Sequence, residues 1–208
     1  MKISIIGMGN VGKALGFRWN AGPHEVMYGV RAPKSDKFVV DQEHKPVRVA
    51  TIAEAVEWGE VIVLALPYEA AIEMASSCGP CAQKVIIDAT NPIAPGLAGL
   101  SVSGNTSGAE ELQKLQPQAH VVKCFNSTGF NNMSNPVYGK QKSVMFYCGG
   151  DAVAKASVRL LTEELGFDAV DAGPLSMARH LESLAMLWIK LAYAEGHGRE
   201  FAFAMLRR

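Results

Sequence analysis

Three glycines near the N-terminus have the spacing Gly-x-Gly-x-x-Gly: Gly7, Gly9 and Gly12. They follow an apolar run at residues 2–6, typical of a buried parallel strand, and precede apolar residues spaced for a helix over residues 11–19. Between a strand and a helix, such glycines allow a tight turn, close approach to a pyrophosphate, and close packing of helix on strand. The N–H groups at the helix start favour an anion by about 0.3–2 kcal/mol. The stretch therefore predicts a dinucleotide-binding turn.

Basic residues stand where the next predicted strand, residues 24–30, comes to its end. In dinucleotide-binding folds an Asp or Glu at this tip holds the free 2′-hydroxyl of NAD. Here the tip is Arg31, and Lys34 and Ser35 lie just beyond it. A guanidinium suits the 2′-phosphate of NADP. A charge-assisted hydrogen bond to that phosphate contributes about 1.5–3 kcal/mol, which corresponds to a preference of roughly 10- to 100-fold for NADP over NAD. We therefore expect NADP(H) to bind here; the alternative is an arginine that is merely solvated at a strand end.

Two further predicted strands, residues 60–66 and 84–88, lead into loops at the same expected edge. Pro67 has no N–H to donate to a sheet, so the first of these strands must stop there. Asn91 lies in the loop that follows the second strand. Because ligands of doubly wound sheets bind at the carboxyl ends of the strands, we expect both loops to border the cofactor.

Asn126, Ser127 and Thr128 form a polar loop after the predicted strand at residues 120–125. Their amide and hydroxyl groups, without a carboxylate, can hold the carboxamide of a nicotinamide ring or a polar electron acceptor. The same residue types also favour local bonds from side chain to backbone, so a self-bonded turn is an equal alternative. These three residues are the candidates for the acceptor side of the site, and none is assigned a catalytic role with certainty.

The cysteines are too few and too irregular for a disulfide framework. Cys78 and Cys81 enclose Gly-Pro, which reproduces the thioredoxin-type dithiol sequence. Thiols of that type are activated at the start of a helix, whereas these two close a predicted helix over residues 68–77. We therefore interpret the motif as a helix stop, with redox activity as the alternative.

The sequence contains no motif typical of a metal site, a serine nucleophile or an acid–base pair. The five histidines show no metal-ligand spacing with cysteine or carboxylate, and no Gly-x-Ser-x-Gly marks a serine nucleophile, so we expect no metal site. No obvious acid–base pair stands out either. Such a sequence is compatible with hydride transfer between two ring systems, where the cofactor carries the chemistry.

The composition narrows the class of partner. Twenty basic and twenty acidic residues give zero formal net charge, which offers no electrostatic footprint for nucleic acid or an anionic membrane. No apolar run approaches the roughly 18 residues of a membrane span, and no secretory signal pattern opens the chain. We expect a cytoplasmic protein whose partner is a small-molecule electron acceptor, with no nucleic acid and no membrane.

Strands and helical patterns alternate along the 208 residues, which predicts an α/β fold: a Rossmann-type, doubly wound, mostly parallel sheet. The expected organisation is an NADP-binding domain over residues 1–173 and a small C-terminal helical extension over residues 174–208, in the same compact unit. The extension is apolar on more than one side, which indicates a homodimer interface or deep packing within one subunit. A final helical turn or two is expected over residues 200–206.

Four blocks of sequence, at residues 7–12, 29–31, 65–70 and 171–183, together resemble the NADP oxidoreductases that depend on coenzyme F420, a deazaflavin. The resemblance extends over nearly the whole chain, and the block at 171–183 is more specific than the glycine pattern. It implies a Rossmann-type domain, a helical extension that dimerises, and hydride exchange between NADPH and the deazaflavin. The residues implied to hold the pyrophosphate are Met8, Gly9, Asn10 and Val11.

By the same resemblance, Arg31 and Ser35 hold the 2′-phosphate, and Leu66 and Pro67 flank the cofactor. The archaeal deazaflavin enzymes carry a serine before the strand-tip arginine, where this chain has Val30. Their acceptor-side loop carries a histidine. The loop at residues 123–128 is instead similar to that of the cytoplasmic domain of STEAP metalloreductases and of short bacterial relatives, which use NADPH to reduce flavin and, through it, metal ions.

The sequence therefore predicts an NADPH-dependent oxidoreductase that passes hydride between NADP(H) and F420 or a flavin-like acceptor such as FAD or FMN. One alternative is an NADPH-dependent reductase of another small molecule or of a ferric chelate. Another, from a different class, is a non-catalytic NADPH-binding protein that senses redox state.

Overall fold

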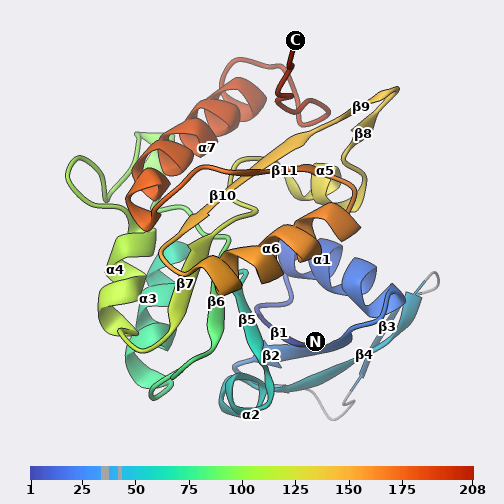
Figure 1. Cartoon of the computed structure of the whole chain (residues 1–208), viewed down its shortest axis with the longest axis vertical. Helices are drawn as coiled ribbons and strands as arrows, with labels where there is room; N and C mark the ends of the chain where they lie inside the picture. The colour runs from blue at the N-terminus through green and yellow to red at the C-terminus, as the bar shows by residue number, and fades with distance from the viewer. Residues whose placement is uncertain (34–37, 42–43) are drawn as a thin grey trace.

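The computed structural model describes residues 1–33, 38–41 and 44–208. Within these residues the main sheet has nine strands in the order β11-β10-β7-β6-β5-β1-β2-β4-β3 (Figure 1). The predicted α/β fold with a mostly parallel sheet is confirmed. The strands are β1 (Lys2–Ile6), β2 (Glu25–Val30), β3 (Phe38–Asp41), β4 (His44–Thr51), β5 (Val61–Leu64), β6 (Val85–Asp88), β7 (His120–Lys123), β10 (Val144–Gly149) and β11 (Asp168–Asp171).

Parallel pairing aligns the ends of the central strands. β1 pairs in parallel with β2 on one side and with β5 on the other, and β6 and β7 continue the same direction. β10 runs antiparallel to β7, and β3 antiparallel to β4. The carboxyl ends of β1, β2, β5, β6 and β7 therefore share one edge, and the loops that leave them are neighbours.

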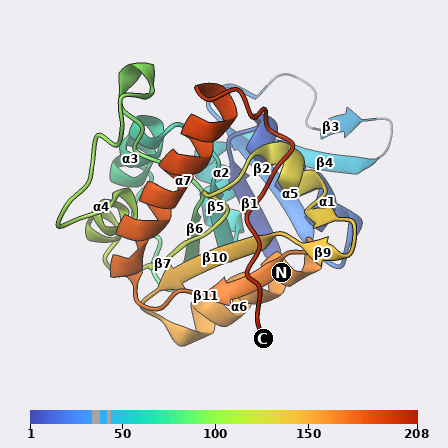
Figure 2. The same ribbon diagram turned by 90° about the horizontal axis from the view of Figure 1, so that it is seen from above.

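Helices cover both faces of the sheet (Figure 2). Successive residues of the central strands point to opposite faces: Val63 packs with α1 and α6, whereas Leu64 packs with α2, α3 and α4. Both faces are thus buried, which explains why these strands are continuously apolar in sequence. The helices are α1 (Asn10–Ala21), α2 (Ile52–Trp58), α3 (Tyr68–Ser77), α4 (Gly108–Leu115), α5 (Phe130–Ser134), α6 (Ala152–Glu164) and α7 (Ala178–Tyr193).

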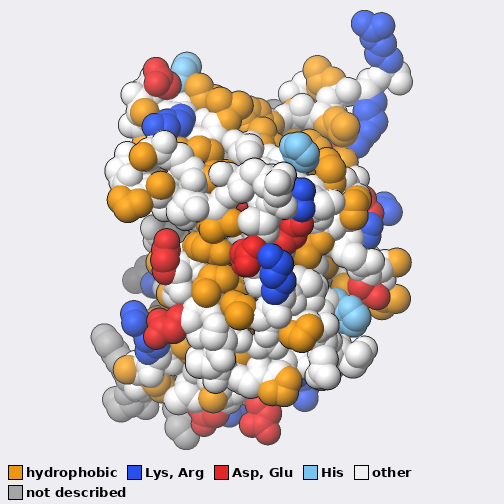
Figure 3. Space-filling model, turned by 90° about the vertical axis from the view of Figure 1, so that its left-hand side faces the viewer, with side chains coloured by type: hydrophobic (Ala, Val, Ile, Leu, Met, Phe, Trp, Pro, Cys, Tyr) orange, Lys and Arg blue, Asp and Glu red, His pale blue; other side chains and the backbone are white. Residues whose placement is uncertain are grey.

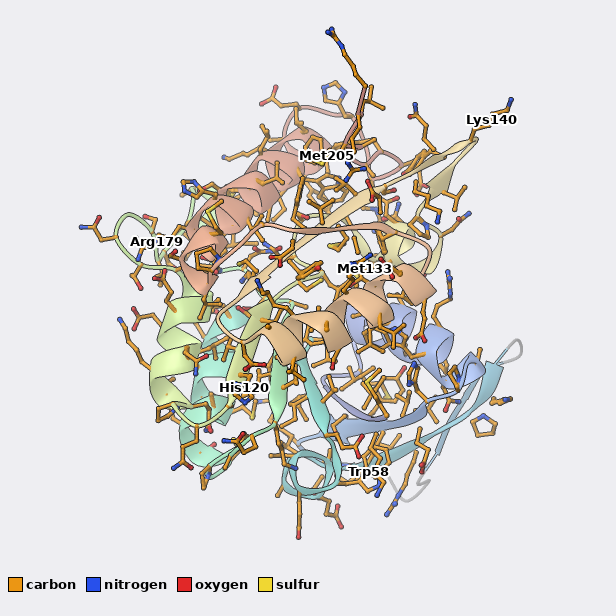
Figure 4. All side chains as sticks on the ribbon, in the orientation of Figure 1. Trp58, His120, Met133, Lys140, Arg179 and Met205 are labelled. Atoms are coloured by element: carbon orange, nitrogen blue, oxygen red, sulfur yellow. The ribbon has the colours of Figure 1, made fainter. Side chains whose placement is uncertain are left out.

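The last helix, α7, is fixed to the sheet layer at its N-terminal end. Ala178 and Leu181 belong to the core beneath α3 and α4. Arg179, at the junction of α7 with α4 in Figure 4, donates from Nη2 to the Glu110 carboxylate at 2.6 Å and from Nε at 2.8 Å. Further along, Leu187 is 50% exposed and Tyr193 is 59% exposed. One face of the helix is therefore packed within the subunit along its whole length, as far as Trp188 and Ala192, and the other face carries exposed apolar side chains.

The chain after α7 differs from the prediction of a helical turn over residues 200–206, which is wrong. Gly196 and Gly198 adopt φ values of +75° and +72°, which end the helix. The following segment is extended: Phe201 stacks on Trp188 with ring centroids 5.3 Å apart, and the carbonyl of Phe203 accepts the Val144 N–H at 2.9 Å. Stacking on α7 and a backbone hydrogen bond to the start of β10 thus fix its conformation.

Figure 3 shows the side of the molecule that carries α3 and α4, where hydrophobic side chains alternate with acidic and basic ones. Among the described residues, no helix is both long enough and apolar enough to cross a membrane. Within the same ranges, no three His, Cys, Asp or Glu side chains are grouped closely enough to hold a metal ion.

Candidate functional site

The glycine turn between β1 and α1 has the close packing that its sequence predicts. Gly7 adopts φ +106°, and its N–H donates to the Gly29 carbonyl at 3.0 Å. A Cβ at Gly7 would press on the carbonyl oxygen of Ala65, and a Cβ at Gly12 would press on the carbonyl oxygen of Gly7. Both positions exclude any side chain because backbone atoms occupy the space.

Gly9 is exposed and differs from its two neighbours in the motif. A Cβ built there would meet nothing within 4 Å, so the space beside it is open to solvent. Gly9 is the N-cap of α1, and the first helical bond runs from the Lys13 N–H to the Gly9 carbonyl at 2.9 Å. The N–H groups of Asn10, Val11 and Gly12 therefore have no intrahelical partner.

Charge at the start of α1 also favours an anion. The first turn of α1 holds no acidic residue, as is also true of α5, α6 and α7, whereas the first turns of α2, α3 and α4 hold Glu54, Glu69 and Glu110. Acidic residues satisfy the positive end of a helix dipole, so their lack leaves α1 able to receive a phosphate. Open space at Gly9 and unpaired N–H groups beside it together fit the pyrophosphate of a dinucleotide. Met8 is half-buried against the core at the entry to this turn.

A pocket of about 360 Å³ opens next to this turn, where β2 and β5 end. Three residues of the predicted cofactor site, Arg31, Leu66 and Pro67, line it together. Its other walls come from the start of α2 and one side of α3, including Ile52 and Met74. The pocket is mostly apolar, and the Arg31 guanidinium is exposed, which suits an adenine with a phosphorylated ribose. Lys34 and Ser35 lie outside the described residues.

The loops that follow β6 and β7 are joined by a reciprocal pair of amides. Asn91 Nδ2 donates to the Asn126 carbonyl at 2.9 Å, and Asn126 Nδ2 donates to Asn91 Oδ1 at 3.0 Å. Asn126 Nδ2 also donates to the Leu181 carbonyl of α7 at 3.0 Å. Asn126 is only 5% exposed, and its Oδ1 has no hydrogen-bond partner. A buried acceptor without a donor is costly, by about 1–3 kcal/mol, so the unpartnered oxygen marks Asn126 as an unusual position at the end of β7.

The orientation of Asn126 is set by an unusual backbone conformation at the residue before it. The preceding residue, Phe125, adopts φ +58°, which is unusual for a bulky side chain. The Phe125 ring packs against Trp19 at 5.6 Å and Phe167 at 6.4 Å, in the core on the α1 side. Because the ring is held there, the backbone reverses direction at once and turns Asn126 toward α7.

The other two acceptor-side candidates have different surroundings. Ser127 is buried, with Oγ 4.0 Å from the sulfur of Met145. Thr128 Oγ1 accepts a hydrogen bond at 2.7 Å from Asn132 Nδ2, four residues further on in α5. Thr128 thus makes the local bonding of a self-bonded turn, whereas Asn126 makes contacts distant in sequence.

A buried ion cluster that sequence reasoning missed lies beneath these loops. Lys123 Nζ lies 2.9 Å from the Asp88 carboxylate and 2.8 Å from that of Glu182, and all three side chains are at most 1% exposed. Burial alone would lower the pKa of Lys123, but the two carboxylates outweigh burial and raise it. The ammonium is therefore held charged. The available signal was a lysine within the otherwise apolar segment 121–125.

The ion cluster links four elements at the carboxyl edge. Asp88 ends β6, Lys123 ends β7, and Glu182 lies on α7. The Glu182 carboxylate also accepts the N–H groups of Gly108 and Ala109, at 3.0 and 3.2 Å, and so caps α4 from another helix. Lys123 further donates to the carbonyl of Thr90 at 2.7 Å. The cluster thus holds the loops that carry Asn91 and Asn126 against α7.

Comparisons with known proteins agree with this geometry. The model of the family "NADP oxidoreductase coenzyme F420-dependent" matches residues 2–92. The F420-dependent NADP reductase of Methanothermobacter marburgensis is 30% identical over an alignment of 210 positions, gaps included, that covers 92% of each chain. The chain belongs to this family of NADP oxidoreductases. A crystal structure from Arthrobacter sp. FB24, of a protein proposed to be an F420-dependent NADP reductase, covers 100% of both chains with a TM-score of 0.88 and 31% identity.

A second kind of relative is a metalloreductase. STEAP3 of Rattus norvegicus is 28% identical over 186 residues, or 89% of this chain. The chain spans only 36% of the length of STEAP3. The resemblance of the sequence both to F420-dependent NADP reductases and to STEAP metalloreductases is therefore confirmed, and the protein is a member of an NADP-dependent oxidoreductase family.

Proposed function

We propose that this member of the F420-dependent NADP oxidoreductase family transfers hydride between NADP(H) and a deazaflavin or flavin-like acceptor. The acceptor binds over the loops that contain Pro67, Asn91 and Asn126. The observation that carries the proposal is the buried, unpartnered Oδ1 of Asn126 at the edge that also carries the glycine turn. A carboxamide N–H of nicotinamide matches that oxygen, which fixes the reactive end of the cofactor beside the neighbouring loops.

Each part of the edge has its own task in this proposal. The N–H groups at the start of α1 bind the pyrophosphate, the pocket beside Leu66 and Pro67 receives the adenine, and Arg31 pairs with the 2′-phosphate. Asn126 orients the nicotinamide through its free oxygen. The bound dinucleotide supplies the hydride, so the chain's own contribution is position and exclusion of water.

The residues around Asn126 support hydride transfer over acid–base chemistry. The loop segments 65–67, 89–92 and 124–129 contain no Asp, Glu, Lys, Arg or His. The charged groups that adjoin the second and third segments, Asp88 and Lys123, are sealed from solvent and paired with each other, whereas Glu69, two residues after the first segment, is exposed. A carbonyl reductase needs a proton donor for the developing alkoxide, whereas two ring systems exchange a hydride without one.

Replacing Arg31 with alanine is expected to weaken NADPH binding by about 10- to 100-fold, because a charge-assisted bond to the 2′-phosphate contributes about 1.5–3 kcal/mol. NADH binding should change less than about two-fold, since NADH lacks that phosphate. Fluorescence titration of each nucleotide measures both effects. Arg159→Ala, on the exposed surface of α6, is the matched control. Equal losses for NADPH and NADH in Arg31→Ala would contradict NADP selection at this site.

Replacing Asn126 with alanine is expected to lower kcat/KM for acceptor reduction by about ten-fold or more, since one oriented hydrogen bond is lost at the reacting end. The assay offers the protein F420, FMN, FAD and a ferric chelate in turn at fixed NADPH and follows NADPH oxidation. Asn131→Ala is the control, because Asn131 Oδ1 is also buried and unpartnered but lies on α5 beside the C-terminal segment. If NADPH binds tightly and no acceptor is reduced, a redox-sensing role replaces catalysis.

A second candidate rests on the similarity to STEAP3, which covers most of this chain. In that case the final electron acceptor is a metal chelate and a flavin acts as the intermediate carrier. The same acceptor panel distinguishes the two: reduction of ferric chelate that requires added flavin favours the metalloreductase-like reaction, and turnover with F420 alone favours the deazaflavin reaction.

A further inference from the structure

Cys78 and Cys81 are close enough to react with each other. Their sulfur atoms lie 3.8 Å apart, and both thiols are free. The motif does end α3, as the sequence predicts, with Cys78 as the C-cap residue and its N–H bonded to the Met74 carbonyl at 2.9 Å. A disulfide bond is about 2.05 Å long, so closure needs a relative movement of about 2 Å. Ending a helix and forming a dithiol are therefore compatible.

The two thiols have unequal surroundings. Cys78 is half-buried and borders the pocket, whereas Cys81 is 1% exposed. A hydrogen bond from Cys81 lowers the pKa of Cys78 to about 7, and the same bond together with burial raises the pKa of Cys81. Cys78 is thus the accessible nucleophile and Cys81 the protected resolving thiol, which is the division of roles that thiol–disulfide exchange requires.

Gln116, at the end of α4, holds the segment that carries both cysteines. Its Oε1 accepts the Cys81 N–H at 2.9 Å, and its Nε2 donates to the carbonyls of Ala75 at 2.6 Å and Gly79 at 3.0 Å. The same Nε2 lies 3.7 Å from the sulfur of Cys78. The Cys-Gly-Pro-Cys turn is therefore held in one conformation, with the two sulfur atoms on the same side of it.

The position of Cys78 connects the pair to the cofactor. Cys78 lines the pocket that also contains Arg31, Leu66 and Met74. When its sulfur moves toward Cys81, one wall of this pocket changes, and the last turn of α3 that carries Met74 is pulled with it. A pocket shaped for the reduced pair is expected to fit an adenine less well after oxidation.

We propose that Cys78 and Cys81 form a reversible dithiol–disulfide site, and that its oxidation weakens dinucleotide binding in the adjacent pocket. The oxidant is a low-molecular-weight disulfide. The Cys78 thiolate attacks one sulfur of that disulfide, forms a mixed disulfide and releases one small thiolate. Cys81 then loses its proton and attacks the Cys78 sulfur, which forms the internal disulfide and releases the second small thiol. The coupling to binding rests on the proposed placement of the adenosine end.

The test compares the full-length protein in its reduced form with the protein oxidised by glutathione disulfide. Peptide mass spectrometry is expected to locate one internal disulfide at residues 78 and 81, with Cys124 and Cys148 still reduced because both are buried. Fluorescence titration should give a Kd for NADPH raised about five-fold or more in the oxidised form, and restored by dithiothreitol. By linkage, NADPH should slow alkylation of Cys78 and shift the thiol–disulfide equilibrium toward the dithiol.

Two variants keep the result interpretable. Cys81→Ser should stop at a mixed disulfide with one glutathione on Cys78, because the resolving thiol is missing. Without oxidant, Cys81→Ser should bind NADPH like the reduced protein, because Cys81 does not line the pocket. The double variant Cys78→Ser with Cys81→Ser should show the same Kd for NADPH with and without oxidant, whatever that Kd is; thermal unfolding verifies that both variants are folded. Failure to form the internal disulfide overturns the proposal, and so does an oxidised protein with unchanged NADPH affinity. If even the reduced protein fails to bind NADPH, the placement of the dinucleotide and the coupling are both wrong, while thiol mapping still reports on the pair.

Discussion

Gly9→Ala is expected to weaken NADPH binding by about 10- to 100-fold while the free energy of unfolding stays within about 0.5 kcal/mol of the parent. The reason is that no protein atom lies within 4 Å of the Cβ position, so the methyl group fits in the free protein. Its φ of −77° is also allowed for any residue. The added methyl group occupies space that the pyrophosphate needs to approach the N–H groups of α1. Fluorescence titration and denaturant unfolding measure the two quantities separately.

Two other glycines provide the controls for this experiment. Gly12→Ala places a methyl group against the Gly7 carbonyl, so it should lose stability as well as binding. Gly150→Ala, beyond the end of β10, also meets nothing within 4 Å and should change neither property. Unaltered NADPH affinity in Gly9→Ala would show that the pyrophosphate does not lie over this glycine.

The sheet could be predicted from sequence because its determinants are local. A continuously apolar strand such as residues 2–6, followed by turn glycines and a helical pattern, requires burial on both faces and so indicates a parallel sheet. Pro67 marked the end of one strand for a backbone reason alone. These features depend on residues within a few positions of each other, and the structure forms each of them.

The acceptor side depended on contacts that no local pattern encodes. The left-handed conformation of Phe125 follows from where Trp19 and Phe167 hold its ring. The bonding of Asn126 to the carbonyl of Leu181 joins positions 55 residues apart. The extended C-terminal segment was expected to be helical because its composition allows a helix, yet stacking of Phe201 on Trp188 and pairing with β10 decide otherwise.

The residues that line the pocket beside β2 and β5 were predicted more completely than the contacts of Asn126, for a physical reason. Arg31, Leu66 and Pro67 each follow directly from the end of a parallel strand, and parallel strands bring their carboxyl ends to one edge. The additional pocket walls, such as Ile52 and Met74, come from faces of α2 and α3 whose orientation only packing fixes. A pocket wall made by a helix face is not distinguishable, in sequence, from a face that packs on the sheet.

Lys123→Met is expected to lower the free energy of unfolding by about 3–5 kcal/mol, because it leaves Asp88 and Glu182 as buried like charges without a cation. In a chain of this size such a loss lowers Tm by about 6–20 °C. It should also loosen the attachment of β6 and β7 to α7, since Glu182 and the Thr90 carbonyl lose a common donor. Denaturant unfolding at pH 7 measures the loss.

The stability difference between the parent and Lys123→Met is expected to decrease at high pH. The pKa of Lys123 is raised in the folded protein, so the charged ammonium stabilises the fold fully below its unfolded pKa of about 10.4, and this stability is lost as pH rises through the folded pKa. Between about pH 6 and 9 the deficit of Lys123→Met should therefore be constant. Above about pH 10.4 it should shrink, because the unfolded parent loses its lysine proton there while the folded parent still holds it, until the pH passes the folded pKa.

A double-mutant cycle separates the ion cluster from simple loss of packing. In the parent, Asp88 Oδ1 accepts hydrogen bonds from the Thr90 N–H and hydroxyl, at 2.9 and 2.7 Å. Asp88→Asn keeps an oxygen acceptor for these two donors but removes one buried charge. Combined with Lys123→Met, it leaves only Glu182 charged, so the double variant should cost at least 1 kcal/mol less than the sum of the single losses, by a rough estimate for charges in contact. Additive losses would mean that Lys123 contributes by its volume alone. Because Glu182 also caps α4, a coupled cycle implies that charge balance in the cluster holds the acceptor loops, α4 and α7 as one unit.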